Sequence, residues 1–148
     1  MVNSSIKPRY KLEGSYHQLS FMPSAHRLAT ALRSNVPSFG AWLTLPGTIH
    51  ARTLARSSPH LDWVLIDCEH GLIPLVPGVA ESATAIQSSR GDGTGPSPVV
   101  RIPATGTSTG TGWQIKHALD GGARGILVPF VRPFPIVLAE LVIQLFDL

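Results

Sequence analysis

The chain has 148 residues, of which 43% are apolar and 14% charged, and this composition is typical of a single globular domain. Its one cysteine excludes an internal disulfide framework and any zinc or redox site built on paired cysteines. The formal net charge of +3 comes from the first 35 residues, where five basic side chains accompany one acidic side chain. Because the remaining residues are slightly acidic overall, we expect no nucleic-acid partner.

Residues 1–26 are basic and serine-containing, and we expect them to form a disordered leader before the folded body. Such a composition loosely suits a mitochondrial transit peptide, but an upstream extension of a cytoplasmic protein that starts at Met22 is the favoured interpretation. No stretch of the chain approaches the roughly 20 consecutive apolar residues of a membrane-spanning helix. The sequence therefore predicts a cytoplasmic protein without a membrane span.

Strand-like and helix-like patterns alternate along the body of the chain. After a helix-like segment at 27–33, short apolar runs suited to strands occupy 39–45, 62–68, 98–103 and 125–131. Segments with helical spacing of apolar residues lie between them, at 50–57, 74–89 and 113–122. The repeat is about the 30 residues of a strand-helix-strand unit, and crossovers of this length make the strands parallel. Because the second and fourth runs are apolar on both alternating faces, the sheet is expected to be covered on both sides.

Polar residues follow the second and third predicted strands. The second ends in Asp67, Cys68, Glu69 and His70, and the third ends in Arg101. The carboxyl ends of parallel strands meet at one edge, where reactive groups of such folds gather. A carboxylate beside an imidazole suits a general base, and a guanidinium suits a carboxylate or enolate oxygen. The alternative is a structural ion cluster, in which Asp67 or Glu69 pairs with Arg101.

Three other residue types narrow the chemistry. Acidic neighbours disfavour a thiolate, so Cys68 is interpreted as a small buried residue and not as a nucleophile. Trp42 lies in the first predicted strand and either packs in the core or forms a wall of a substrate pocket. The lysines are Lys7, Lys11 and Lys116, and none of them ends a predicted strand. A Schiff-base mechanism is therefore not expected.

Several short sequence strings occur in one order and spacing: GAWL at 40–43, DWVLIDCEHG at 62–71, PVVR at 98–101, QIK at 114–116, LDGGA at 119–123 and GILVP at 125–129. Through these strings, residues 27–131 resemble the HpcH/HpaI aldolase/citrate lyase family. The resemblance implies metal-dependent (class II) cleavage of 2-keto-3-deoxy or 4-hydroxy-2-oxo acids into pyruvate and an aldehyde. It also implies His70 as the acid/base, Arg101 as the group that stabilises the enolate oxygen, and Asp67 as the residue that orients His70. By the same resemblance, Trp42 would help to line the site. Trp42 and Glu69 are the predicted substrate-binding residues.

The family fold is a (β/α)8 (TIM) barrel, which needs about 250 residues. The expected fold class is therefore α/β, a truncated barrel of about four parallel strands with intervening helices. The family's ligands for the divalent metal, Mg, Mn or Co, come from later strands and match no residue here. Residues 132–148 form an apolar tail that departs from the family.

A half-barrel of this kind would leave its first and fourth strands unpaired and one apolar face uncovered. We therefore expect a homo-oligomer or an aggregation-prone chain. The alternative to an active aldolase is a truncated, catalytically inactive fragment that at most binds a ligand or associates with another subunit.

Overall fold

Helices and strands alternate throughout the computed structural model, which describes residues 26–104 and 110–130. In chain order they are α1 (Arg27–Arg33), β1 (Gly40–Leu43), α2 (Thr48–Arg56), β2 (Trp63–Asp67), α3 (Gly78–Gln87), β3 (Ser97–Arg101), α4 (Gly112–Asp120) and β4 (Gly125–Leu127). The expected leader, except its last residue His26, and the expected apolar tail lie outside these residues.

The strands form one parallel sheet in the order β1-β2-β3-β4. Each helix between two strands carries the chain back to the start of the next strand, as a parallel arrangement requires. The predicted fold of four parallel strands with intervening helices is thus confirmed. Helix α3 is shorter than its predicted range because Pro77 is its N-cap and the helix begins only after it. No helix within 26–104 or 110–130 is long and apolar enough to cross a bilayer.

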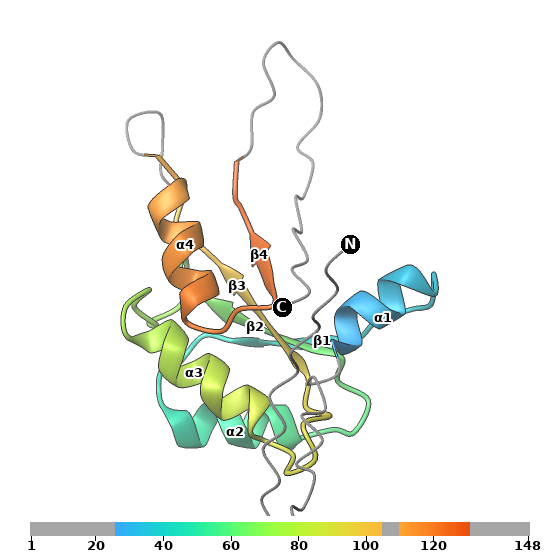
Figure 1. The fold of residues 1–148 in the computed structure, drawn as a ribbon. Coiled ribbons are helices and arrows are strands. Elements are labelled where there is room, and N and C mark those ends of the chain that lie inside the picture. The colour runs from blue at the N-terminus through green and yellow to red at the C-terminus, as the bar shows by residue number, and fades with distance from the viewer. Residues whose placement is uncertain (1–25, 105–109, 131–148) are drawn as a thin grey trace, which may run out of the picture.

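The two faces of the sheet are covered differently. Helices α2, α3 and α4 lie on one face (Figure 1), where Val64, Ile66 and Val100 belong to the larger core. On the other face Leu65 and Val99 pack against Leu28 of α1. Since side chains alternate along a strand, the residues two positions beyond Leu65 and Val99 also belong to this second face. This alternation places the last residues of β2 and β3 on the face opposite the three helices.

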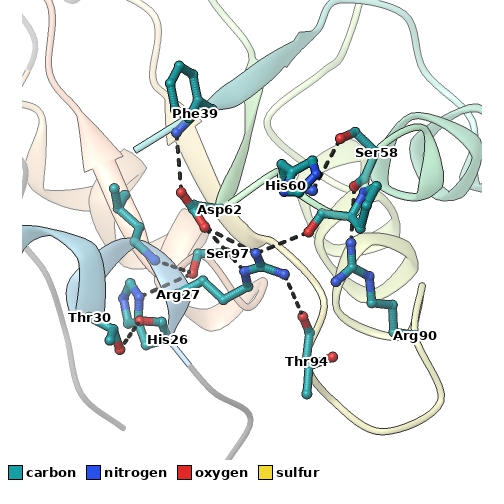
Figure 2. A network of polar contacts seen from close by, with 12 residues as sticks. His26, Arg27, Thr30, Phe39, Ser58, His60, Asp62, Arg90, Thr94 and Ser97 are labelled. Carbon is teal, nitrogen blue, oxygen red and sulfur yellow. Dashed lines mark hydrogen bonds and ion pairs between the residues drawn. The ribbon is translucent and has the colours of Figure 1, made fainter. Parts of the chain in front are cut away.

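Helix α1 is fixed to the amino-terminal edge of the sheet by His26 (Figure 2). The imidazole Nδ1 of His26 accepts the backbone N–H of Ala29 at 3.1 Å and so caps the helix. The hydroxyl of Ser97, at the start of β3, lies 3.2 Å from the same nitrogen. The opposite ring nitrogen, Nε2, lies 2.9 Å from the carbonyl oxygen of Arg124. His26 is therefore part of the folded body.

Arg27 and Asp62 form the second anchor of α1, also visible in Figure 2. Arg27 Nη2 lies 3.2 Å from Asp62 Oδ1, and Asp62 Oδ2 accepts the backbone N–H of Phe39 at 3.2 Å. Asp62 and Phe39 directly precede β2 and β1, so this ion pair lies where those strands begin. The opposite, carboxyl-terminal edge of the sheet is the edge where the sequence predicted the polar cluster.

Candidate active site

The five candidate site residues lie together around the carboxyl-terminal edge of β1, β2 and β3. Trp42 belongs to β1, Asp67 ends β2, and Arg101 ends β3. Asp67 and Arg101 are direct partners in the parallel register. Glu69 and His70 follow β2 in the turn that leaves the sheet. The sequence thus located the cluster through the position of each residue at a strand end.

Asp67 and Arg101 form a buried two-bond ion pair. Arg101 Nε donates to Asp67 Oδ1 at 2.9 Å and Nη2 donates to Oδ2 at 2.5 Å, while Asp67 is only 2% exposed. Burial alone would raise the pKa of Asp67, but hydrogen bonds from Arg101 and from two backbone N–H groups lower that pKa from 3.8 to about 2. The hydrogen bond with Asp67 raises the pKa of Arg101. Both groups are therefore charged near neutral pH.

The chain turns away from the sheet directly after Asp67. Asp67 Oδ1 accepts the backbone N–H of Glu69 at 3.0 Å and that of His70 at 3.1 Å, and this local turn ends the strand. Gly71 completes the turn, because a Cβ at that position would lie 2.3 Å from the carbonyl oxygen of Asp67. The glycine after His70 is the sequence signal for this turn, and it predicted that the chain turns out at Gly71.

Glu69 connects the ion pair to the imidazole. Although β2 does not continue to Glu69, Glu69 Oε2 lies 3.4 Å from Arg101 Nη1 and 3.5 Å from His70 Nε2. The Glu69 carboxylate is nearly buried, whereas the His70 side chain is 71% exposed. The Glu69 carboxylate thus faces the imidazole ring of His70. The Asp67 carboxylate instead accepts the backbone N–H of His70. The resemblance implied that Asp67 orients His70. The contact that the structure describes between these two residues is the hydrogen bond from the His70 backbone N–H to the Asp67 carboxylate.

The guanidinium of Arg101 lies over the face of the Trp42 indole ring. The guanidinium carbon is 4.6 Å from the centroid of the indole ring, a cation–π distance. Trp42 is 47% exposed. Of the two interpretations of this residue, its exposure and its contact with Arg101 favour a wall of the site over core packing.

Cys68 and Lys116 do not contribute a nucleophile to the cluster. Cys68 packs partly buried against the larger core, and burial, aided by the nearby charge of Asp67, raises the pKa of its thiol to about 11. Lys116 is exposed on α4, where it pairs with Asp120 one helical turn later. Cys68 was interpreted from the sequence as a buried residue and not as a nucleophile; the structure shows it only partly buried, and its raised pKa agrees with the second part of that interpretation. Lys116 lies on a helix, as the sequence predicted.

The described residues do not form a metal site. Within residues 26–104 and 110–130, no three side chains of His, Cys, Asp or Glu are grouped so that they could hold a metal ion. The two carboxylates of the cluster, Asp67 and Glu69, both contact Arg101. A divalent cation has no cage of oxygen ligands among them.

Comparisons with known proteins identify the family. A hydroxypyruvate/pyruvate aldolase of Agrobacterium fabrum is 36% identical over 106 residues, which are 72% of this chain and 35% of that protein. A 4-hydroxy-2-oxo-heptane-1,7-dioate aldolase of Klebsiella pneumoniae is 35% identical over 102 residues, or 69% of this chain and 34% of that protein. The crystal structure of an HpcH/HpaI aldolase/citrate lyase family protein from Burkholderia cenocepacia matches with a TM-score of 0.59 and 33% identity, over 72% of this chain and 38% of that chain.

This chain belongs to the HpcH/HpaI aldolase/citrate lyase family. No protein-family model matches it. The resemblance seen in the sequence is confirmed, and the four-stranded sheet of this HpcH/HpaI chain is related to the TIM barrels of its structural neighbours. The chain covers only 34% to 38% of the length of these three relatives. The activity and substrates of these relatives therefore extend to this chain only as a proposal.

Proposed function

We propose that this chain carries part of the active site of an aldolase-type carbon–carbon lyase. The substrate would be a 2-keto-3-deoxy or 4-hydroxy-2-oxo acid, and the products would be pyruvate and an aldehyde. The observation that carries the proposal is the arrangement of Arg101, held by two carboxylates, beside the exposed imidazole of His70. Relatives named as aldolases support the reaction class.

Arg101 is the proposed group that stabilises the enolate. A guanidinium has five N–H donors, of which Asp67 takes two and Glu69 faces a third. The other two N–H groups can donate to the oxygen on C2 of the oxo acid, where negative charge develops. Because Asp67 already fixes the guanidinium, little reorganisation is needed when that charge appears, and preorganised donors stabilise the transition state strongly.

His70 is the proposed acid/base. In the cleavage direction its imidazole takes the proton of the hydroxyl on C4, directly or through one water. The C3–C4 bond breaks, the C4–O bond becomes the carbonyl of the aldehyde, and the electron pair of the broken bond forms the enolate of pyruvate. The proton then returns to C3 and gives pyruvate. The exposure of His70 allows it to reach such a substrate, and Glu69 supports the imidazolium that forms.

The resemblance implies a divalent cation, which would be Mg, Mn or Co. The proposal includes this cation only as an additional requirement for activity. The described residues do not fit it, because the two carboxylates of the cluster are bound to Arg101 and no group of three ligands is present among them. No step of the mechanism is therefore assigned to the metal. Its ligands would have to come from outside the described residues.

An inactive binding fragment is the second candidate function. It is favoured by the sheet itself, because in the described residues β1 and β4 each pair with a single neighbour. Unpaired strand edges promote association with other chains. On this view the cluster would bind a 2-oxo acid without cleaving it, and the chain would form homo-oligomers. A 2-oxo acid partner, the oligomeric state and a cytoplasmic location remain predictions in either case.

Pyruvate release tests the proposal directly. The 148-residue chain is incubated with 4-hydroxy-2-oxoheptanedioate or a 2-keto-3-deoxy sugar acid and Mg²⁺, Mn²⁺ or Co²⁺, and pyruvate is measured with lactate dehydrogenase. We expect release that a chelator abolishes and that His70→Ala or Arg101→Met removes. His60→Ala, which changes an exposed histidine at the other edge of the sheet, is the matched control and should retain activity. A folded wild-type chain without turnover would contradict the lyase and support the binding fragment.

A further inference from the structure

Arg101 is held by residues of two neighbouring strands and the turn after β2. Asp67 binds the Nε and Nη2 edge of its guanidinium, and Glu69 approaches Nη1. Trp42 contributes the remaining contact, with its indole ring 4.6 Å from the guanidinium carbon. Since β2 lies between β1 and β3, the side chains of Arg101 and Trp42 must together span β2 to meet. Such a reach spans two strand spacings, about 10 Å.

We propose that Trp42 is a positioning residue that fixes the orientation of the Arg101 guanidinium. The two N–H groups of Arg101 that have no partner among the described residues then face the flat carboxylate or enolate oxygens of a 2-oxo acid. This inference rests on the proposed function, because it assigns those N–H groups to the substrate. It goes beyond the view of Trp42 as a wall of the pocket. The indole acts on the ligand through Arg101.

The geometry of the ion pair explains why a third contact matters. Two parallel hydrogen bonds to Asp67 keep the guanidinium edge in place but leave it free to tilt about the line that joins the two carboxylate oxygens. The contact with Glu69 is longer, at 3.4 Å, and joins only one nitrogen. The face of the indole ring, 4.6 Å from the guanidinium carbon, limits this tilt. The donors left for a ligand are then held in one orientation.

Charge explains why an aromatic ring suits this place. Asp67 and Glu69 already supply two negative charges to the single positive charge of Arg101, so a third carboxylate would repel an anionic substrate. The face of an indole attracts a cation without adding a net charge. Trp42 thus holds Arg101 while leaving the charge of the site unchanged.

The orientation of Arg101 can be measured without any ligand. Ring currents of Trp42 should shift the NMR signals of the Arg101 δ-protons upfield in the wild-type chain. Trp42→Leu should abolish this shift, and Trp42→Phe should retain part of it. Trp113→Leu is the matched control, because Trp113 is 56% exposed on α4 and should leave the signals unchanged. Unfolding midpoints of the variants identify any general loss of structure.

Binding of oxalate, a planar dianion shaped like the pyruvate enolate, tests the consequence for the ligand. With Mg²⁺ present in every titration, we expect Trp42→Leu to weaken oxalate binding about fivefold, and Trp113→Leu to have no effect. Arg101→Met should abolish binding. The inference is wrong if Trp42→Leu binds oxalate like the wild type while Arg101→Met does not. It is also wrong if the NMR signals of Arg101 are the same in Trp42→Leu as in the wild type. In both cases the proposed function stands. If Arg101→Met binds like the wild type, or the wild type does not bind, the proposed role of Arg101 fails and the inference fails with it.

Discussion

Asp67 and Arg101 occupy partner positions at the ends of two neighbouring parallel strands, and their side chains point to the same face of the sheet. The register therefore places a carboxylate and a guanidinium side by side without a turn of the backbone to bring them together. Because Asp67 is buried, each charge depends on the other for its stability. Stability and the proposed chemistry of Arg101 are thus linked through one ion pair.

The pH dependence of stability should show this pair. The pKa of Asp67 is about 2 in the folded chain against 3.8 for an ordinary carboxyl group, so the unfolded chain binds more protons between these values. The contribution, about 2 kcal/mol, should be complete above about pH 4 and lost as the pH falls towards 2. Urea unfolding of the wild type and of Asp67→Asn across this range measures it. An equal acid-induced loss in both chains would contradict the prediction.

Removing both partners of the ion pair should cost less than the sum of the two single removals. Arg101→Met leaves the carboxylate of Asp67 buried without its counter-charge, and we expect a loss of about 3 kcal/mol in the free energy of unfolding. Asp67→Asn leaves the guanidinium without its anion and should also destabilise the fold. In the double variant neither charge remains, so its loss should be clearly smaller than the sum of the single losses. Additive losses in this double-mutant cycle would mean that the two side chains do not interact.

Gly40 should be intolerant of a side chain. A Cβ at this position would lie 1.9 Å from Cδ2 of Trp63, a ring that packs against the core on the second face of the sheet. Gly40→Ala should therefore lower the free energy of unfolding by about 2 kcal/mol, because the large ring must move. Gly91→Ala is the control, since a Cβ there meets no atom within 4 Å. Equal unfolding midpoints for the two variants would show that Trp63 moves without cost.

The Cys68 thiol should react slowly in the folded chain. Burial and the charge of Asp67 raise its pKa from 9.0 to about 11, which lowers the thiolate fraction at pH 8 about a hundredfold. Reaction with Ellman's reagent should accordingly be much slower in the native chain than in the same chain unfolded in urea. Similar rates in the two states would show that the thiol is more accessible than the structure indicates.

The cap at His26 should control the stability of α1. His26→Ala removes the acceptor for the backbone N–H of Ala29 and the contacts with Ser97 and Arg124. We expect a loss of about 1 kcal/mol, seen as faster amide hydrogen exchange in Arg27–Arg33. His60→Ala should leave this exchange unchanged, because the described hydrogen bond of His60 uses its backbone N–H. Unchanged exchange in His26→Ala would show that other contacts fix the helix.

The sequence determined the order of the elements and the place of the candidate site. The short apolar runs that contain Leu65 and Val99, separated by a segment of helical spacing, were sufficient to predict parallel strands. The polar residues that follow those runs, Asp67 and Arg101, were therefore predicted to share one edge. Both predictions depend on the spacing of apolar residues along the chain. This spacing is a property of neighbouring residues, so it does not require knowledge of contacts with distant segments.

Only the tertiary structure decided which side chains contact one another. The contact of Glu69 with the His70 ring depends on the turn that Asp67 builds with its side chain. The contact of Trp42 with Arg101 depends on the register of three strands, and residues 59 positions apart carry no local signal of it. His26 was assigned to the leader because its partners, Ser97 and Arg124, are distant in the sequence. Strand register and side-chain direction arise when the whole sheet packs, so local patterns locate a site without specifying the contacts within it.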